Sequence, residues 1–424
     1  MGLLALFALL ALGIPVGFAM LISGALGLWL VGGTTLVVGY LSTTPLATTS
    51  AYELITVPMF ILMAELVILS GVANSLFSAA AVWVGRMPGG LGVATALAGA
   101  GFGAICGSST ASAATLSATS VPAMLERNYH PKMATGVVAI SGTLAMLIPP
   151  SIALVLYAII ADEDIGKLLI AGVIPGIVVM LAIAATVYIL VLINPSHGPG
   201  GRRYSMREKL ASLKVAGPVV FLFMLVTGVI YFGIATPTEA SALGATGAML
   251  LTIWQRKLTW RTLIRALMAS AATSCMIFMI IMGAKFFGYF FTLTRITQNT
   301  IVYIDQLGLA PVTVLIIVLA IYFVLGCIMD QAAILILTVP IVLPVMVALG
   351  YDPIWFGVIV IIMAEIGLVT PPLGLNAFVV SKYTRRPLEE VFSGLWPHIF
   401  AHLLVVALLC IFPQFVLWLP EQMR

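Results

Sequence analysis

Residues 147–151 read Leu-Ile-Pro-Pro-Ser, and residues 369–373, which lie 222 positions further along the chain, read Val-Thr-Pro-Pro-Leu. The same offset aligns the two halves of the chain without a gap. Nine of the identities at this offset, six of them proline, are Pro15 and Pro237, Pro122 and Pro344, Pro131 and Pro353, Pro149-Pro150 and Pro371-Pro372, Pro175 and Pro397, Met124 and Met346, Tyr129 and Tyr351, Gly172 and Gly394. Since the chain holds only 23 prolines in 424 residues, the pattern indicates two copies of one unit.

The composition places both units in a membrane. Hydrophobic residues make up 62% of the chain and charged residues only 8%, whereas soluble domains carry about 25% charged residues. Apolar stretches of about 20 residues, long enough to cross a bilayer as helices, follow one another along the chain. Because these stretches do not alternate between polar and apolar residues, we expect helices and exclude a β-barrel.

The distribution of basic residues predicts opposite orientations for the two units. Residues 32–56 carry no Lys or Arg, whereas the matching residues 254–278 carry Arg256, Lys257, Arg261 and Arg265. Likewise, residues 162–164 are Asp-Glu-Asp where residues 384–386 are Thr-Arg-Arg. Conversely, Arg86, Arg127 and Lys132 match the uncharged Gly308, Leu349 and Ile354. Lys and Arg collect in cytoplasmic loops, so opposite charge at equivalent positions indicates inverted insertion.

We therefore predict an all-α polytopic membrane protein with two inverted repeats, each of about five transmembrane helices plus a re-entrant hairpin. Repeat one is expected over residues 1–202 and repeat two over residues 223–424. Residues 203–222 are expected to form a cytoplasmic linker and the start of the first helix of repeat two. An inverted duplication with broken helices is the pattern typical of secondary transporters.

Each repeat is predicted to be broken at two matching places. The hairpins are expected at 89–124 and 311–347, and the helices broken at the Pro-Pro pairs at 133–161 and 354–381. Proline frees a carbonyl group upstream, and irregular backbone at membrane depth is tolerated around a water-filled site. Freed carbonyls suit a small hard cation such as Na⁺, while helix N-termini and hydroxyl groups suit an anion. Two cation sites with substrate between them follow from this arrangement.

Some of these features also have a purely structural interpretation. Runs of Ser, Thr and Gly, as at 107–112, commonly pack transmembrane helices closely. Asp330 is expected to be a buried acid of the second hairpin, with a functional role by default and a structural hydrogen bond as the alternative. Three further acids stand in or beside apolar helices without an evident partner: Glu53, Glu65 and Glu365.

The sequence predicts neither an enzyme nor a transition-metal site. His398 and His402 have the spacing of metal ligands on a helix, but a third ligand is missing, so packing is favoured. Phosphate-binding loops, nucleophile elbows and zinc-protease motifs do not occur in the sequence. The net charge of +4 reflects basic loops, and nucleic acid is not expected as a partner.

Several motifs, taken together and in order, resemble the large membrane (permease) subunit of the tripartite ATP-independent periplasmic (TRAP) transporters, the DctM-like family. The resemblance covers essentially the whole chain. The motifs that carry it are Leu12-Gly13-Ile14-Pro15-Val16-Gly17, Val57-Pro58-Met59-Phe60, Gly107-Ser108-Ser109-Thr110-Ala111-Ser112, Ile148-Pro149-Pro150-Ser151, Thr236-Pro237-Thr238-Glu239-Ala240 and Thr370-Pro371-Pro372-Leu373-Gly374-Leu375-Asn376.

The resemblance implies a multi-pass protein of the bacterial inner membrane that takes up a small organic acid, such as a C4-dicarboxylate or sialic acid, together with Na⁺. It implies an elevator mechanism, in which hairpins and broken helices move as a transport domain against a scaffold. The implied partners are a small four-helix membrane subunit, a periplasmic solute-binding protein, the carboxylate substrate and the lipid bilayer. Na⁺ is the coupling ion, and no other cofactor is implied.

The resemblance also implies site residues. One Na⁺ site would use Ser108, Ser109, Ala145, Ile148 and Pro149. The second would use Gly326, Asp330, Gly367, Thr370 and Pro372. Substrate contacts would come from Thr110, Ser151 and Asn376.

Two other functions remain open at this point. A receptor-independent Na⁺ or H⁺ exchanger or anion transporter of related fold would transport substrate without any periplasmic protein. An intramembrane enzyme would need a convergent catalytic set, which the four histidine positions of the chain do not supply.

Overall fold

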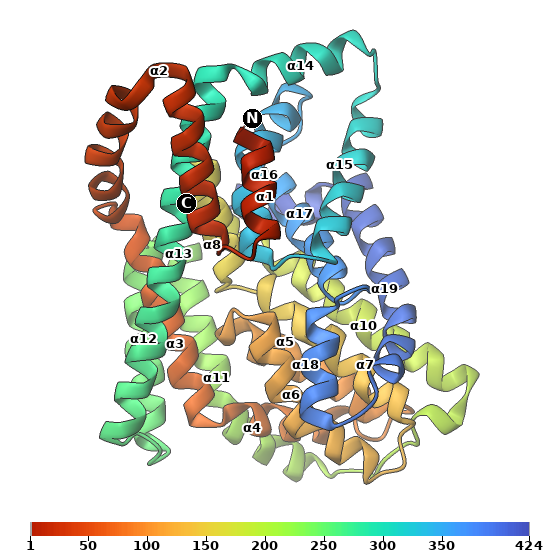
Figure 1. Ribbon diagram of the computed structural model, residues 1–424. Coiled ribbons are helices and arrows are strands. Elements are labelled where there is room, and N and C mark those ends of the chain that lie inside the picture. The colour runs from red at the N-terminus through yellow and green to blue at the C-terminus, as the bar shows by residue number, and fades with distance from the viewer. Residues whose placement is uncertain (1, 424) are drawn as a thin grey trace.

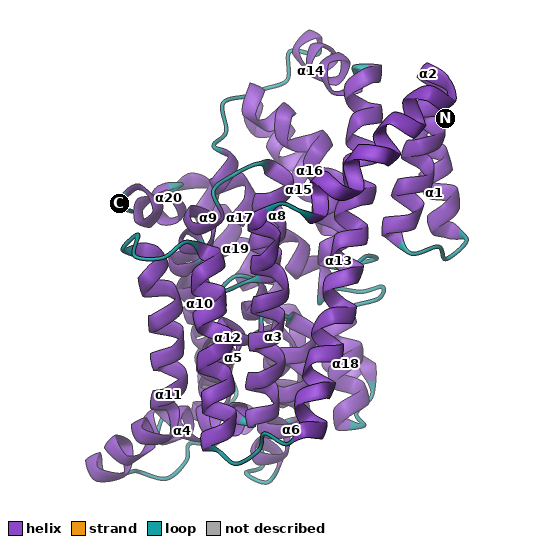
Figure 2. Ribbon diagram, turned by 90° about the vertical axis from the view of Figure 1, so that its left-hand side faces the viewer, coloured by secondary structure: helices purple, strands orange, loops and turns teal. Residues whose placement is uncertain are grey.

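The computed structural model describes residues 2–423, and all regular structure within this range is helical (Figure 1, Figure 2), which confirms the predicted fold class. The elements of the first half are α1 (Gly2–Ala11), α2 (Val16–Thr49), η1 (Tyr52–Ile55), α3 (Thr56–Ser70), α4 (Val72–Val84), α5 (Gly90–Cys106), α6 (Ser109–Leu125), α7 (Pro131–Gly142), η2 (Thr143–Met146), α8 (Ile152–Ala161), α9 (Ile165–Ala171), α10 (Val173–Ile193) and η3 (Pro195–His197). Those of the second half are α11 (Met206–Tyr231), α12 (Pro237–Trp254), α13 (Trp260–Thr294), α14 (Ile296–Gln306), α15 (Pro311–Gly326), α16 (Gln331–Ala348), α17 (Pro353–Leu368), α18 (Leu375–Thr384), α19 (Leu388–Ile411) and α20 (Gln414–Glu421).

Helix boundaries repeat at the offset of 222 residues. When α6, α7 and α8 are shifted by this offset, their first residues fall within one residue of the starts of α16, α17 and α18. Pro131 and Pro353 each occupy the first turn of a helix, where a missing N–H is not needed. The preceding residues, His130 and Asp352, cap these helices by accepting a backbone N–H bond of the first turn. The matched prolines therefore mark matched helix starts.

The two hairpins lie in opposite halves of the molecule. The pair α5–α6 lies in the lower half of Figure 1 and the pair α15–α16 in the upper half, and Figure 2 agrees. Inverted repeats would place the hairpins in this way, although the orientation of each repeat in the membrane stays a prediction. Helix α11 begins at Met206, so most of the segment 203–222 is helical rather than linker.

Among the described residues 2–423, six helical segments are long and apolar enough to cross a membrane by length and composition. They are Val16–Thr49, Tyr52–Ser70, Ile165–Ile193, Trp260–Thr294, Gln331–Ala348 and Leu388–Ile411. The broken helices are not among them, because α7, α8, α17 and α18 are each shorter than the roughly 20 residues that a crossing needs. The breaks therefore divide what would otherwise be full-length spans.

Helix α3 joins the two repeats along one side of the molecule. It packs against α12 and α13, and α2 packs against α13. The Thr56 hydroxyl lies 2.8 Å from the Thr238 hydroxyl, and the Thr252 hydroxyl donates to the Leu66 carbonyl oxygen at 3.0 Å. At the end of α3, the Lys257 ammonium group donates to the Ser70 carbonyl oxygen at 2.7 Å, which satisfies an unpaired acceptor of the last turn.

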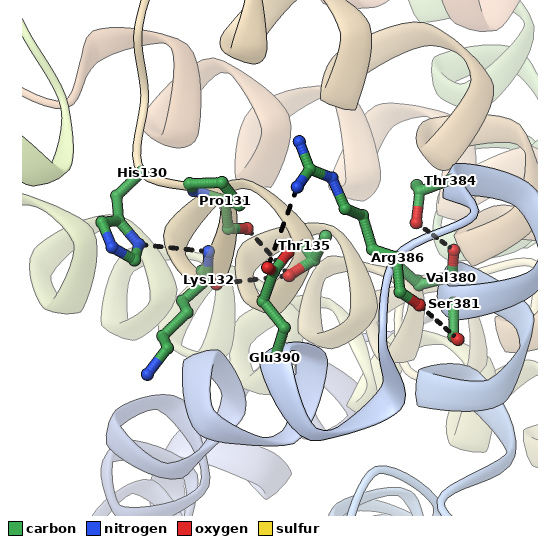
Figure 3. Close-up of polar contacts among 9 residues, drawn as sticks. All are labelled: His130, Pro131, Lys132, Thr135, Val380, Ser381, Thr384, Arg386 and Glu390. Atoms are coloured by element: carbon green, nitrogen blue, oxygen red, sulfur yellow. Dashed lines mark hydrogen bonds and ion pairs between the residues drawn. The ribbon is translucent and has the colours of Figure 1, made fainter.

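A second junction of the repeats lies where the first turn of α7 meets the link between α18 and α19 (Figure 3). In this link, Arg386 pairs with Glu390 of α19 at 3.9 Å, and the Ser381 hydroxyl donates to the Arg386 carbonyl oxygen at 2.7 Å. Nearby, Gly136 and Gly394 bring the two backbones into contact. A Cβ atom on Gly136 would lie 2.8 Å from the Cα atom of Gly394.

Replacing Gly394 by alanine should destabilise this junction, because the added methyl group would collide with the Lys132 backbone carbonyl. Overpacking of this kind costs about 1–3 kcal/mol, and we expect a lower melting temperature in detergent. Gly288→Ala in α13 is the matched control, since nothing lies within 4 Å of its added Cβ atom. Equal melting temperatures for the two variants would contradict the close contact.

Candidate functional site

The tip of the first hairpin rests on the first broken helix. Helix α5 ends at Cys106, Gly107 turns the chain with a φ of +59°, and Ser108 caps α6 by accepting the Ala111 N–H at 3.4 Å. A Cβ atom on Gly107 would lie 3.3 Å from the Pro150 carbonyl oxygen, so the tip and the break are in van der Waals contact. Residues far apart in the sequence thus meet at the predicted first cation site.

The break meets the hairpin through backbone atoms as well as side chains. Ala145 lies in η2, Ile148 and Pro149 lie between η2 and α8, and all three are buried. Gly103 of α5 lets the hairpin approach closely, since a Cβ atom there would lie 2.8 Å from the Ala145 Cα atom. A backbone carbonyl ligand at Ala145 is therefore compatible with this geometry, as the resemblance implies.

Ser109 is one of three buried hydroxyls of this region that lack a partner among the described residues. Its side chain is fully buried, and its Oγ atom makes no hydrogen bond within the described residues. The hydroxyls of Ser112 on α6 and Ser141 on α7 are orphaned in the same way. Leaving a buried polar group unsatisfied costs about 1–3 kcal/mol. Orphaned hydroxyl oxygens beside freed carbonyls are the kind of donor set that a hard cation such as Na⁺ accepts.

The second predicted cation site is assembled by close contact between two glycines. A Cβ atom on Gly367 would lie 2.6 Å from the Gly326 Cα atom, so the end of α15 touches the end of α17. Thr370 is buried, its N–H donates to the Gly367 carbonyl oxygen at 2.8 Å, and its hydroxyl donates to the Ile366 carbonyl oxygen at 2.6 Å. Pro372 follows the break and is exposed. Three of the predicted residues are thus brought together, while Pro372 faces outward.

Asp330 was expected to be buried, and this expectation is wrong. Its side chain is exposed at the start of α16, where Oδ1 accepts the N–H groups of Ala332 at 2.7 Å and Ala333 at 3.4 Å. The residue is a helix N-cap, which corresponds to the structural alternative weighed for it. The sequence could not separate these roles, because an N-cap and a buried ligand both call for Asp at a hairpin tip.

The three predicted substrate residues differ in availability. Thr110 is half-buried and shares a contact of 3.3 Å with the Ser108 hydroxyl. Ser151 is buried and already bonded, since it caps α8 and donates to the Met146 carbonyl oxygen. Asn376 is fully buried, and both polar atoms of its amide lack partners. Asn376 stands in the first turn of α18, which packs against α6 of the other repeat.

Two buried polar residues complete the region. Gln331, which follows Asp330, donates from Nε2 to the Ile361 carbonyl oxygen at 3.2 Å and leaves its Oε1 atom unpaired. Glu365 on α17 is 3% exposed, and both of its carboxylate oxygens lack partners. The sequence signalled Glu365 as an acid in an apolar helix, and it placed Gln331 beside Asp330 at the tip of the second hairpin without giving it a role. An amide beside an acid at a hairpin tip carries no signal of its own.

The two buried histidines of α19 lie outside this region. His402 Nδ1 lies 2.8 Å from the His398 carbonyl oxygen one turn earlier. Among residues 2–423, the structure places no third His, Cys, Asp or Glu in position to form a metal cluster with them. Their arrangement corresponds to helix packing.

Comparison with known proteins identifies the family. The model of the family described as "Tripartite ATP-independent periplasmic transporter, DctM component" matches residues 3–415. The chain belongs to this TRAP permease family. The resemblance seen in the sequence is thereby confirmed, and the permease is a multi-pass protein of the inner membrane.

The names of related permeases give several different substrates. The C4-dicarboxylate TRAP transporter large permease protein DctM of Pseudomonas aeruginosa is 34% identical, covering 88% of this chain and 87% of that protein. The sialic acid permease SiaM of Vibrio cholerae is 31% identical over 97% and 96% of the two chains. The ectoine permease TeaC of Halomonas elongata is 30% identical over 98% and 97%.

A solved structure shares the fold. The YdaH transporter of Alcanivorax borkumensis superposes with a TM-score of 0.69, covering 96% of this chain and 98% of that chain at 13% identity. At this identity the likeness concerns the fold alone.

The role of Asp330 as a helix cap can be separated from any role of its charge. Asn caps helices about as well as Asp, whereas Ala at an N-cap costs about 1 kcal/mol. In KCl without Na⁺, we expect Asp330→Asn to melt with the wild type and Asp330→Ala to melt earlier. Equal destabilisation of the two variants would contradict the capping role, because the charge of Asp330 rather than its capping bond would then determine the melting temperature.

Proposed function

We propose that this permease drives the uptake of a small organic acid across the inner membrane by coupling it to Na⁺. A periplasmic solute-binding protein delivers the substrate, and a small four-helix membrane subunit completes the transporter. The observation that carries the proposal is the group of orphaned buried oxygens, above all that of Ser109, at the contact between hairpin one and the broken helices. C4-dicarboxylate and sialic acid relatives support an organic acid as substrate.

The oxygen ligands of the region would bind Na⁺, and the Asn376 amide would bind the substrate. Ser108, Ser109 and the backbone of the first break would hold one Na⁺, and the ends of α15 and α17 with Thr370 would hold the other. A bound Na⁺ supplies positive charge next to the substrate carboxylate. The free amide of Asn376, in the first turn of α18, can donate to that carboxylate, and the positive end of the α18 dipole favours an anion there.

The packing of the helices supports an elevator motion. Helices α2, α3, α12 and α13 form a connected group that is hydrogen-bonded across the repeats, as expected for a scaffold. Helices α5 to α8 and α15 to α18 form the other group, in which each hairpin packs against the half-helix of the opposite repeat. We propose that this second group moves as one body and carries the site past the scaffold.

Thermal unfolding of the purified permease in NaCl and in KCl at equal ionic strength tests Na⁺ coupling. A ligand that binds only the folded state stabilises by RT ln(1 + [L]/Kd), about 2.7 kcal/mol at one hundred times Kd. We expect a saturable rise in melting temperature in Na⁺ that is reduced in Ser109→Ala and in Thr370→Ala. Ser42→Ala, which removes an exposed hydroxyl bonded only to its own helix, is the control and should keep the full rise.

The same protein, reconstituted with its small subunit, tests receptor dependence. Uptake of a C4-dicarboxylate into vesicles should require both a Na⁺ gradient and the periplasmic protein. Uptake that is equally fast without the periplasmic protein would favour a receptor-independent transporter of related fold. No Na⁺ effect on melting or uptake would overturn the proposed coupling.

A further inference from the structure

Glu365 is a buried acid for which the described residues offer no counter-charge. Its side chain is 3% exposed on α17, and neither carboxylate oxygen has a hydrogen-bond partner. The ion pairs within residues 2–423, Arg202 with Glu208 and Arg386 with Glu390, both lie elsewhere. An isolated carboxylate at membrane depth is costly and, as a rule, marks an ion or substrate pathway.

Glu365 stands on a helix that also borders the first break. The Ser109 hydroxyl at the tip of hairpin one is within reach of its carboxyl group, although the pair does not meet the geometry of a hydrogen bond. Helix α17 also packs against η2 and α8, which flank the first break. Glu365 therefore belongs to repeat two but lies near Ser109, one of the oxygens predicted for the first cation site.

The same place in the other repeat is built differently. At the offset of 222 residues, Glu365 corresponds to Thr143 and Ser109 corresponds to Gln331. The Thr143 hydroxyl donates to the Ile140 carbonyl oxygen at 2.7 Å and needs no further partner. The acid of the second site, Asp330, is exposed and engaged as a helix cap. A buried and unpartnered carboxylate thus stands at one of the two pseudo-equivalent sites.

We propose that Glu365 completes the first cation site across the repeat boundary, so that this site carries a negative charge and binds Na⁺ more tightly than the second site. The inference rests on the proposed Na⁺ coupling and adds a residue and a ranking of the two sites to it. A carboxylate is a hard ligand that suits Na⁺ better than neutral hydroxyls alone, and a bound cation would satisfy Glu365 and Ser109 together. The second site would then rely mainly on neutral oxygens from Gly326, Gly367 and Thr370.

Equilibrium dialysis with radioactive sodium measures the Na⁺ affinity of the two sites without any transport assay. We expect Glu365→Gln, which keeps the shape and removes the charge, to weaken the tighter Na⁺ site at least tenfold. Glu390→Gln is the control, because Glu390 is a partly buried acid of α19 that pairs with Arg386 and lies outside both predicted sites. Its Na⁺ binding should equal that of the wild type.

Double variants show whether Glu365 acts on the Na⁺ site of Ser109 or on that of Thr370. Glu365→Gln and Ser109→Ala act on one site, so their combined loss should be smaller than the product of the single losses. Glu365→Gln and Thr370→Ala act on different sites, so their losses should multiply. Should Glu365→Gln fail to fold in KCl, Ser109→Ala alone must weaken the tighter site, and an unchanged affinity would count against the inference.

The outcomes separate this inference from the proposed function. A folded Glu365→Gln variant that binds Na⁺ like the wild type would overturn the role of Glu365 and leave Na⁺ coupling intact. Wild-type protein that binds no sodium would overturn the proposed coupling and the inference with it. Loss of affinity in Glu390→Gln as large as in Glu365→Gln would also overturn it, since the effect would then not depend on the site.

Discussion

Free backbone groups at membrane depth are the constraint on which the rest of this permease depends. A polar backbone group in hydrocarbon must find a partner inside the protein, and this chain interrupts its helices at four places. The breaks are acceptable because they face one another: the first hairpin touches the first break at Gly107, and α15 touches α17 at Gly326. Burial of the breaks against each other is also what creates a polar region inside an apolar molecule.

The two repeats share their backbone geometry, whereas different side chains at equivalent positions give each site its own chemistry. Matched prolines place matching helix starts in both repeats, as at Pro131 and Pro353. One pair of different side chains at equivalent positions is Thr143 in the first repeat and Glu365 in the second. Two sites with the same backbone design can therefore differ in charge, and a pseudo-symmetric framework can bind two ions with different strength.

The sequence predicted the framework well because its boundaries are marked by proline, glycine and capping residues. The hairpin expected at 89–124 is found in α5 and α6, and the hairpin expected at 311–347 in α15 and α16. The predicted site residues were harder to judge. Asp330 proved to be an exposed cap, because sequence does not reveal which way a residue at a hairpin tip faces. Glu365 and Ser109 belong to different repeats, and a relation between residues so far apart in the sequence leaves no local signal.

The bond from Lys257 to the Ser70 carbonyl oxygen bears on how the protein is made. The two residues are 187 positions apart, and the donor belongs to the second repeat. When α3 leaves the ribosome, its last turn has no such donor, and the helix is completed only after α12 has been inserted beside it. A truncated chain that stops before α12 would therefore lack this donor, and the Ser70 carbonyl group would be left without its partner from the second repeat. Biogenesis of the first repeat is in this sense finished by the second.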